Sequence, residues 1–323
     1  MTVSKVMRDT PDISADTKVR IKLLAQQMGY VPDTAAQGLR TRHTKLLGLL
    51  IPSITNPIYV RFLLAVEEAV FHAGYELIIA HTLNDPSREE LLIRRFLARR
   101  VDGLMIMPVS SREIESPIYK ELAKKLTPTV IIGQKPTYCN QFNNVEVDDF
   151  EASYSMTNHL LGLGHKRIAF LAGPTFSLWA QARLEGYKKA LNDASITVDD
   201  HLIFNAGSTL EEGESTALQL IKESPQATAI QSVNDLVAMG AGNALLNKGL
   251  RIPNDYSLAG FGNVLAAEFF RVPLTTVRIP KYRLGAAATE MILQMLKGEP
   301  VESKKLSSEI IIRASTSANS TSV

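Results

Sequence analysis

The chain has little of what anchors or cross-links proteins outside the cytoplasm. Its 323 residues include one cysteine, Cys139, so no internal disulfide forms, and no metal-ligand spacing surrounds it. The N-terminus lacks the uninterrupted apolar stretch of a signal peptide. The apolar run Leu46–Ile51 is far too short to cross a bilayer. These absences favour a cytoplasmic protein without a membrane partner.

Signatures of catalysis are also lacking. Gly162-Leu163-Gly164 is a fragment of a phosphate-loop pattern, but it precedes a predicted strand, which is the wrong context. His165 beside it is expected to be a turn or capping residue rather than a base. No Ser/His/Asp order, metal spacing or pair of catalytic carboxylates emerges. We therefore predict a protein that is not an enzyme and needs no cofactor.

What is present is an ordinary globular composition, with 45% hydrophobic and 21% charged residues. The length exceeds one ordinary core, so two or more domains are expected. The net charge of +2 is unevenly spread, with +4 in residues 1–45 and −2 in the remainder. A basic end on a near-neutral body suits a phosphate-binding appendage, although a solvated helix face has the same composition.

Short apolar runs alternate with longer amphipathic segments after Thr44. The predicted strands are 47–51, 76–80, 103–107, 129–132, 145–147, 167–172, 229–232, 257–260 and 308–312. The predicted helices are 58–72, 87–99, 116–125, 150–162, 178–193, 210–222, 236–248 and 283–297. This alternation predicts an α/β fold of two doubly wound parallel-sheet subdomains.

Ligands of such sheets bind beyond the carboxyl ends of the strands. The segments at those ends are 52–57, 81–85, 108–111, 133–135, 148–149, 173–183, 234–235 and 261–263. In two facing subdomains, these segments are expected to converge on one cleft.

The N-terminal segment resembles part of a helix-turn-helix. Residues 1–7 have the pattern of its second helix, and Ser14 is a good N-cap for a further helix over 15–28. That helix places Val19, Leu23 and Met28 near one face, and Gly29 is a plausible end. A partial all-α headpiece is therefore expected before the α/β body.

Nine motifs, in order and in spacing, carry a family resemblance over almost the whole chain. They read TVSKV (2–6), LAQQMGYVP (24–32), LGLLIPSITNP (47–57), RVDG (100–103), LGHKRIAFLAGP (163–174), RLEGY (183–187), NDLVAMG (234–240), GLRIP (249–253) and PLTTV (273–277). Together they resemble the LacI/GalR family of bacterial repressors. The resemblance implies a periplasmic-binding-protein-like body, a homodimer, and a ligand-responsive repressor of a carbohydrate-use operon. It also implies that the chain crosses three times between the subdomains.

The resemblance implies a division into three parts. Residues 1–45 would form the partial headpiece with a hinge helix over 33–42. Residues 46–147 and 278–303 would form the N-terminal effector subdomain, and residues 148–277 and 304–323 the C-terminal one.

At the DNA end, Thr2, Ser4 and Lys5 match the recognition helix that enters the major groove of operator DNA. Lys5 stands where arginine is usual and lacks the fork suited to guanine. Ser4 and Lys5 could equally face water while Val3 and Val6 pack. The hinge residues expected to meet DNA, with Leu39 as a minor-groove wedge, are Ala36, Leu39, Arg40 and Arg42.

The first headpiece helix has no counterpart in the sequence. Without it, Val3, Val6, Leu23 and Leu24 are expected to lie open to solvent. Two explanations remain: Met1 is a mis-assigned start, or the chain is truncated and binds DNA weakly or not at all. The alternative functions are accordingly a headless sugar sensor and a solute-binding receptor.

At the effector end, Arg183 matches the family arginine that grips the ligand, although a surface helix arginine is the simpler reading. Asp235 is equally a helix N-cap or first-turn acid, Tyr59 equally core, and Trp179 equally a packed helix residue. The full predicted effector set is Asn56, Tyr59, Gln134, Lys135, Trp179, Arg183, Asn234, Asp235 and Gly262.

Departures from the family pattern bear on the ligand. Many sugar-sensing members carry an aspartate directly after the phenylalanine of a Gly-Phe-Asp-Asp turn, where this chain has Gly262, and Gln134-Lys135 replaces a common Asp-Arg pair, so two carboxylates are lost. Lys281 is expected nearby. These changes, with a likeness to gluconate-type repressors, predict an anionic effector such as a sugar acid or sugar phosphate.

Overall fold

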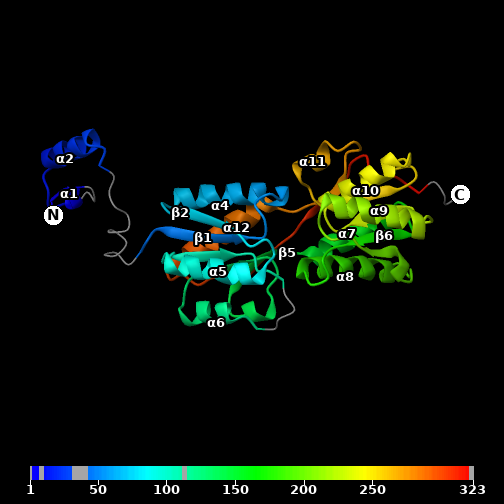
Figure 1. Ribbon diagram of the computed structural model, residues 1–323, viewed down its shortest axis with the longest axis horizontal. Helices are drawn as coiled ribbons and strands as arrows, with labels where there is room; N and C mark the ends of the chain where they lie inside the picture. The colour runs from blue at the N-terminus through cyan, green and yellow to red at the C-terminus, as the bar shows by residue number, and fades with distance from the viewer. Residues whose placement is uncertain (1, 7–10, 31–42, 111–114, 320–323) are drawn as a thin grey trace. The chain divides into compact units, whose positions relative to one another are not determined.

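The computed structural model describes residues 2–6, 11–30, 43–110 and 115–319. The chain divides into two compact units, Met1–Lys45 and Leu46–Val323, and each is described by itself (Figure 1).

The first unit contains α1 (Thr2–Val6) and α2 (Ala15–Gln27). Gly29, with φ +62°, follows α2. Ser14 precedes α2 in extended conformation, but its hydroxyl bonds Thr17 rather than capping the helix. Val3, Leu23 and Leu24 are exposed as expected. The expectation was wrong for Val6, which is buried.

The second unit begins with a six-stranded parallel sheet of order β11-β5-β4-β3-β1-β2. Its strands are β1 (Leu46–Ile51), β2 (Glu76–His81), β3 (Gly103–Ile106), β4 (Thr129–Ile132), β5 (Asn143–Val147) and β11 (Lys304–Leu306). One face packs against α4 (Val60–His72) and α12 (Lys281–Leu296). The other packs against α5 (Pro86–Ala98) and α6 (Pro117–Lys124). This part of the chain also contains two short 3-10 helices, η1 (Pro57–Tyr59) and η2 (Thr137–Cys139).

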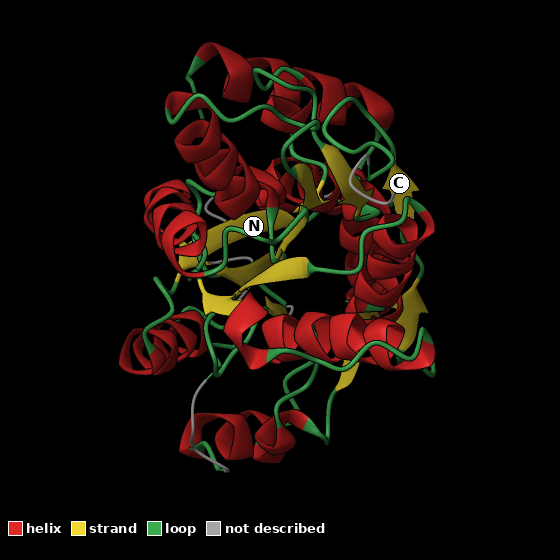
Figure 2. Ribbon diagram, turned by 90° about the vertical axis from the view of Figure 1, so that its right-hand side faces the viewer, coloured by secondary structure: helices red, strands yellow, loops and turns green. Residues whose placement is uncertain are grey.

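A second six-stranded sheet has the order β12-β10-β9-β8-β6-β7, with only β12 antiparallel to its neighbour. Its strands are β6 (Ile168–Ala172), β7 (Ile203–Asn205), β8 (Ala229–Ser232), β9 (Ser257–Gly262), β10 (Thr275–Arg278) and β12 (Glu309–Ile311). Its flanking elements are α7 (Asp149–Gly162), α8 (Leu178–Asp193), η3 (Asp200–Leu202), α9 (Leu210–Glu223), α10 (Asp235–Asn247) and α11 (Leu265–Glu268). Figure 2 shows helices flanking the strands.

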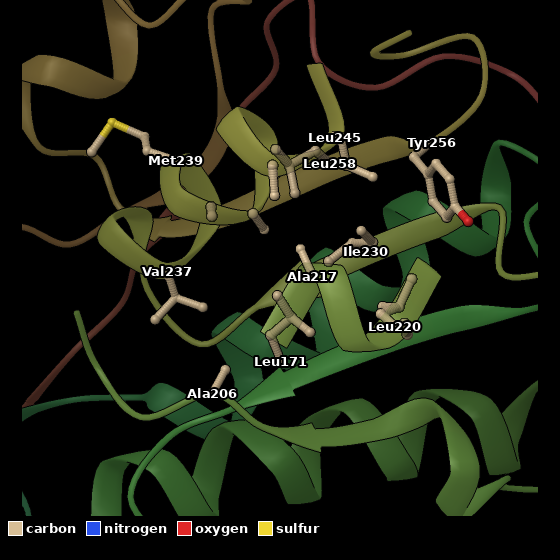
Figure 3. Close-up of a cluster of buried hydrophobic side chains, with 14 of the residues drawn as sticks. Leu171, Ala206, Ala217, Leu220, Ile230, Val237, Met239, Leu245, Tyr256 and Leu258 are labelled. Atoms are coloured by element: carbon tan, nitrogen blue, oxygen red, sulfur yellow. The ribbon is translucent and has the colours of Figure 1, made fainter. Parts of the chain in front are cut away.

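The core of the second sheet shows why these segments fold as they do. Leu171, Ile230 and Leu258 point from adjacent strands into one apolar layer with Val237 and Leu245 of α10 (Figure 3). Strands covered on both faces read as continuous apolar runs, which is the pattern that predicted them. The predicted α/β class of two doubly wound sheets is confirmed.

The chain crosses between the two subdomains three times: from β5 to α7, from β10 to α12, and from β11 to β12. The third crossing falls later than the predicted boundary after residue 303. Lys304–Leu306 pairs with β5 in the first sheet, so the change of subdomain lies between Leu306 and Glu309.

Candidate ligand-binding site

Arg183 lies near three other predicted effector residues, namely Tyr59, Trp179 and Asp235. It is carried by α8 and is only 7% exposed. Its Nε and Nη2 donate to Oδ1 of Asp149 at 2.9 and 2.7 Å, and its Nη1 donates to the carbonyl oxygen of Val233 at 2.6 Å. Arginine has five N–H groups, so two remain beyond these bonds to described residues. The guanidinium is therefore fixed in place and still has donors for a ligand.

Asp149, the partner of Arg183, begins α7 directly after β5. Burial raises the pKa of its carboxyl, and the Arg183 charge acts in the opposite direction. Its neighbour Asp148 caps the helix by accepting from the N–H of Glu151 at 3.1 Å. The sequence prediction omitted Asp149 from the site. The sequence signal that could have indicated it was an acid at the start of a helix directly after a buried strand, together with an arginine on another helix.

Two aromatic rings hold the guanidinium from its sides. The Arg183 Cζ lies 3.5 Å from the ring centroid of Phe261 and 4.7 Å from that of Trp179. Desolvated contacts of this kind are worth about 2 kcal/mol or more. Trp179, half-buried against the second-sheet core, thus packs on its helix and also borders the arginine.

Asp235 is almost fully buried in the first turn of α10. Its Oδ1 accepts from the Thr276 hydroxyl at 2.5 Å, and its Oδ2 accepts from the N–H of Val264 at 2.8 Å. Burial raises the pKa of its carboxyl, while these two donors lower it. Asp235 therefore lies in the first turn of α10 and is not its N-cap, and its contact with an effector stays a prediction.

Asn234 is the residue that caps α10. Its Oδ1 accepts from the N–H of Val237 at 2.8 Å, and its Nδ2 donates to the Ser208 carbonyl at 3.0 Å. Asn56 plays the same part for η1 in the first subdomain, where it accepts from the N–H of Ile58 at 3.0 Å. Both predicted effector residues therefore fix the backbone at the start of a helical element.

Gly262 ends β9 where the second subdomain meets Ile58 of the first. Its φ is +131°, and a Cβ added there would lie 2.8 Å from Cδ1 of Ile58. Tyr59 follows in the same turn. Burial raises the pKa of Tyr59 to about 12, against the opposing charge of Arg183. Residues from both subdomains thus meet here.

We call this group the junction cluster. It comprises Tyr59, Asp149, Trp179, Arg183, Asp235, Phe261 and Gly262.

Gln134 and Lys135 lie half-buried in the connection between β4 and β5. The Lys135 ammonium donates to the carbonyl oxygen of Phe142 at 3.2 Å, within the same connection. Lys281 donates to the carbonyl oxygen of Gly262. The junction cluster together with Lys281 thus contains two basic side chains, Arg183 and Lys281, and two acidic ones, Asp149 and Asp235.

A surface cavity of about 470 Å³ is lined by none of the junction-cluster residues. Its lining includes Asp148, Lys305 and Glu309, and none of the nine predicted effector residues. His165, also outside the cluster, is buried and bonds Thr228 at 2.9 Å and Ser257 at 3.0 Å. It is a structural residue that ties three segments together.

The structure describes only some of the predicted DNA-binding residues. Thr2, Ser4 and Lys5 lie on α1, and Lys5 pairs with Asp12. The predicted hinge residues lie outside the described residues, namely Ala36, Leu39, Arg40 and Arg42.

Comparison with known proteins agrees with this architecture. Residues 44–316 match the periplasmic binding proteins and sugar binding domain of the LacI family. The chain belongs to the LacI family. The repressor PurR of Haemophilus influenzae is 30% identical over 321 residues, covering 97% of this chain and 94% of PurR.

Two solved structures of LacI-family regulators show the same fold. The transcription regulator GntR from Chromobacterium violaceum is 28% identical with a TM-score of 0.77, covering 84% of this chain and 99% of that one. The lac repressor dimer bound to operator and the anti-inducer ONPF is 24% identical with a TM-score of 0.87, covering 98% and 95%.

This LacI-family chain is a transcriptional regulator and not an enzyme, since the family and these relatives are regulators. Across the described ranges, no group of three or more His, Cys, Asp or Glu side chains is placed to hold a metal. In the same part of the chain, no helix is long and apolar enough to cross a membrane.

Proposed function

We propose that this chain is a cytoplasmic repressor of a carbohydrate-use operon, and that its effector binds at the junction cluster. The observation that carries the proposal is Arg183. Its guanidinium is held by Asp149 and the Val233 carbonyl, flanked by Trp179 and Phe261, and keeps two N–H groups beyond its bonds to described residues. A fixed fork beside aromatic rings suits a ligand with hydroxyl and acidic oxygens.

We propose further that the effector is anionic, a sugar acid or sugar phosphate. Two carboxylates of the family pattern are replaced here by Gly262 and Gln134. Asp149 already neutralises Arg183, so an anion must share the guanidinium with that carboxylate rather than meet an unopposed charge. We therefore predict that the effector binds with moderate affinity, and that its binding depends strongly on the geometry of the Arg183 guanidinium.

A thermal-shift panel tests the effector class. D-gluconate, D-glucuronate and glucose 6-phosphate are compared with glucose, ribose and cellobiose. We expect only the acids to raise the Tm, and R183K, which loses the fork, to abolish the rise. The matched control is R167K, since Arg167 forms an exposed pair with Asp199 and should leave the rise unchanged. Stabilisation by neutral sugars alone would overturn the anionic class.

The effector would act by binding one subdomain arrangement better than the other, and so change the affinity for operator DNA. A DNA shift assay with duplexes selected from a random pool tests the repressor function. It compares the chain as given with one extended by the codons upstream of Met1. Binding by the extended chain alone favours the mis-assigned start. Binding by neither favours the headless-sensor alternative.

We propose a homodimer joined through the outer face of α4 and the edge strand β2. Val60, Leu64 and Phe71 are 61, 50 and 71% exposed on α4, and Ile79 is 43% exposed on β2. Exposed apolar side chains gathered on neighbouring elements mark an interaction surface. Sedimentation of F71E is the test, and a monomer is expected. An unchanged dimer would move the interface elsewhere.

A further inference from the structure

Lys281 joins the two subdomains through a single buried ammonium. It is the first residue of α12, directly after the second crossing, and α12 packs against α4 and strands β3 to β5 of the first subdomain. The Nζ donates to two carbonyl oxygens of the second subdomain, that of Gly262 and, at 2.8 Å, that of Asn263. The backbone belongs to one subdomain and the hydrogen-bond acceptors belong to the other.

Nothing local explains a lysine at this position. The first turn of a helix is its positive end, where a cation is unfavourable. The residue is only 8% exposed, and its acceptors are neutral carbonyl oxygens rather than a carboxylate. A buried ammonium is costly unless its donors are satisfied, so the contacts across the crossing must stabilise it.

The surrounding charges act on this ammonium from three elements. Asp235 of α10 favours its charged form, whereas Arg61 of α4 and Arg278 of β10 oppose it. Burial is the largest effect and lowers the pKa of Lys281 to about 8. The ammonium of Lys281 therefore loses its charge as the pH rises through about 8.

We propose that Lys281 is a latch that sets the angle between the subdomains. In the present arrangement, Ile58 rests against Gly262 and the ammonium holds the carbonyl oxygens of Gly262 and Asn263. Opening the junction at this edge requires the ammonium to leave both oxygens. The latch itself is independent of any ligand. Its part in the response to an effector rests on the proposed function, because Gly262 belongs to the junction cluster.

A second lysine provides a matched control. Lys305 of β11 also bridges the subdomains, with its Nζ 2.8 Å from Oδ2 of Asp148. Its side chain is 54% exposed, and exposed pairs of this kind are worth about 0–1 kcal/mol. Removing Lys305 deletes a bridging cation without removing a buried one.

The test measures the distance between the subdomains in the full chain. Spin labels are placed on cysteines introduced at the exposed positions Lys124 of α6 and Lys222 of α9. The native Cys139 is fully buried, so labelling it requires unfolding. Labelled protein is diluted with unlabelled protein so that each distance comes from one chain.

We expect one narrow distance population for the unsubstituted chain, K281R and K305M. We expect K281M to add a second population or broaden the first. A K281M distribution equal to that of the unsubstituted chain would overturn the latch, and so would an equal change in K305M.

A pH series tests the latch without any substitution at Lys281. Raising the pH from 7 to 9.5 removes charge from the ammonium, so the distribution should move toward that of K281M. K281R, which stays charged, should not respond. A distribution that stays constant over this range would contradict the proposal even if K281M failed to fold.

The distance measurements use no effector. If no sugar in the thermal-shift panel stabilises the protein, the proposed function fails and the latch stands. If the distances are unchanged in K281M, the latch fails and the proposed function stands. Where D-gluconate does stabilise the protein, K281M should weaken its binding by about tenfold while K305M does not.

Discussion

Arg183 donates twice to the same oxygen of Asp149, from Nε at 2.9 Å and from Nη2 at 2.7 Å. Both side chains are about 9% exposed. The pair joins α8 to the start of α7, the helix that follows the first crossing. The residue expected to hold a ligand is therefore also a structural link inside the second subdomain.

Replacing Asp149 should lower the free energy of unfolding, because it breaks the pair with Arg183. D149N keeps the shape but removes the charge that balances a buried guanidinium, and breaking a buried pair costs about 3–5 kcal/mol. Urea unfolding measures the loss. The control is E309Q, which breaks the exposed Arg278–Glu309 pair and should change stability by less than about 1 kcal/mol. Equal losses in the two variants would contradict this account.

Thr276 should matter because it satisfies Asp235. T276V leaves the Oδ1 of a buried carboxylate without its hydroxyl donor, which costs about 1–3 kcal/mol. The substitution T55V, at an exposed threonine, serves as comparison and should be nearly neutral. Chemical denaturation of both variants would show whether Asp235 is held as the structure indicates.

Gly262 should tolerate no side chain. G262A brings its Cβ to 2.8 Å from Cδ1 of Ile58 and imposes a positive φ on alanine. Overpacking alone costs about 1–3 kcal/mol. The double variant G262A/I58V removes the clashing methyl and should recover part of the loss, but not the backbone strain. Tm values of the single and double variants decide this, and the absence of any recovery would place the cost in the backbone alone.

Glu89 should make stability depend on pH. It is 4% exposed and accepts from the N–H of Val109 at 2.8 Å, and burial raises its pKa to about 7. The folded protein binds this proton more tightly than the unfolded chain. The stabilisation is therefore complete below the unfolded pKa of about 4.5 and is lost as the pH rises through about 7.

The substitution E89Q isolates this effect. The difference in unfolding free energy between the unsubstituted chain and E89Q should fall between pH 4.5 and 8, by up to a few kcal/mol. The other titrating groups are shared by both proteins and cancel. A difference that is constant with pH would mean that Glu89 has the same pKa in the folded and unfolded states, and would contradict this prediction.

Strands such as β1, β3 and β4 were recognised because burial on both faces favours continuous apolar residues. The edge strands β2 and β12 are only partly buried, but they too contain short apolar runs. The three that were missed lack that signal. β11 is Lys304-Lys305-Leu306 at a sheet edge, β10 carries two threonines, and β7 has three residues. Their strand conformation comes from pairing with neighbours, which no local pattern contains.

The residues of the candidate site also divide into those that the sequence indicated and those that it did not. Arg183 and Gly262 were named from the sequence, since they follow strands in segments that match a family motif or depart from one. The pairing of Arg183 with Asp149 was not predicted, and neither was the hydrogen bond from Lys281 to the carbonyl oxygen of Gly262. Each depends on contacts between segments that are 34 and 19 residues apart. Nor can a sequence show that Thr276 and Val264 donate to the carboxylate of Asp235, whose contact with a ligand stays a prediction.

The placement of β11 and β12 bears on how the protein is made. These two strands close the edges of different sheets, and both lie within residues 304–311. Domains generally fold as units during synthesis, from the N-terminus onward. Here neither sheet has all its strands until residues 304–311 have been made. The two sheets are therefore completed together, after all their other strands, rather than one after the other.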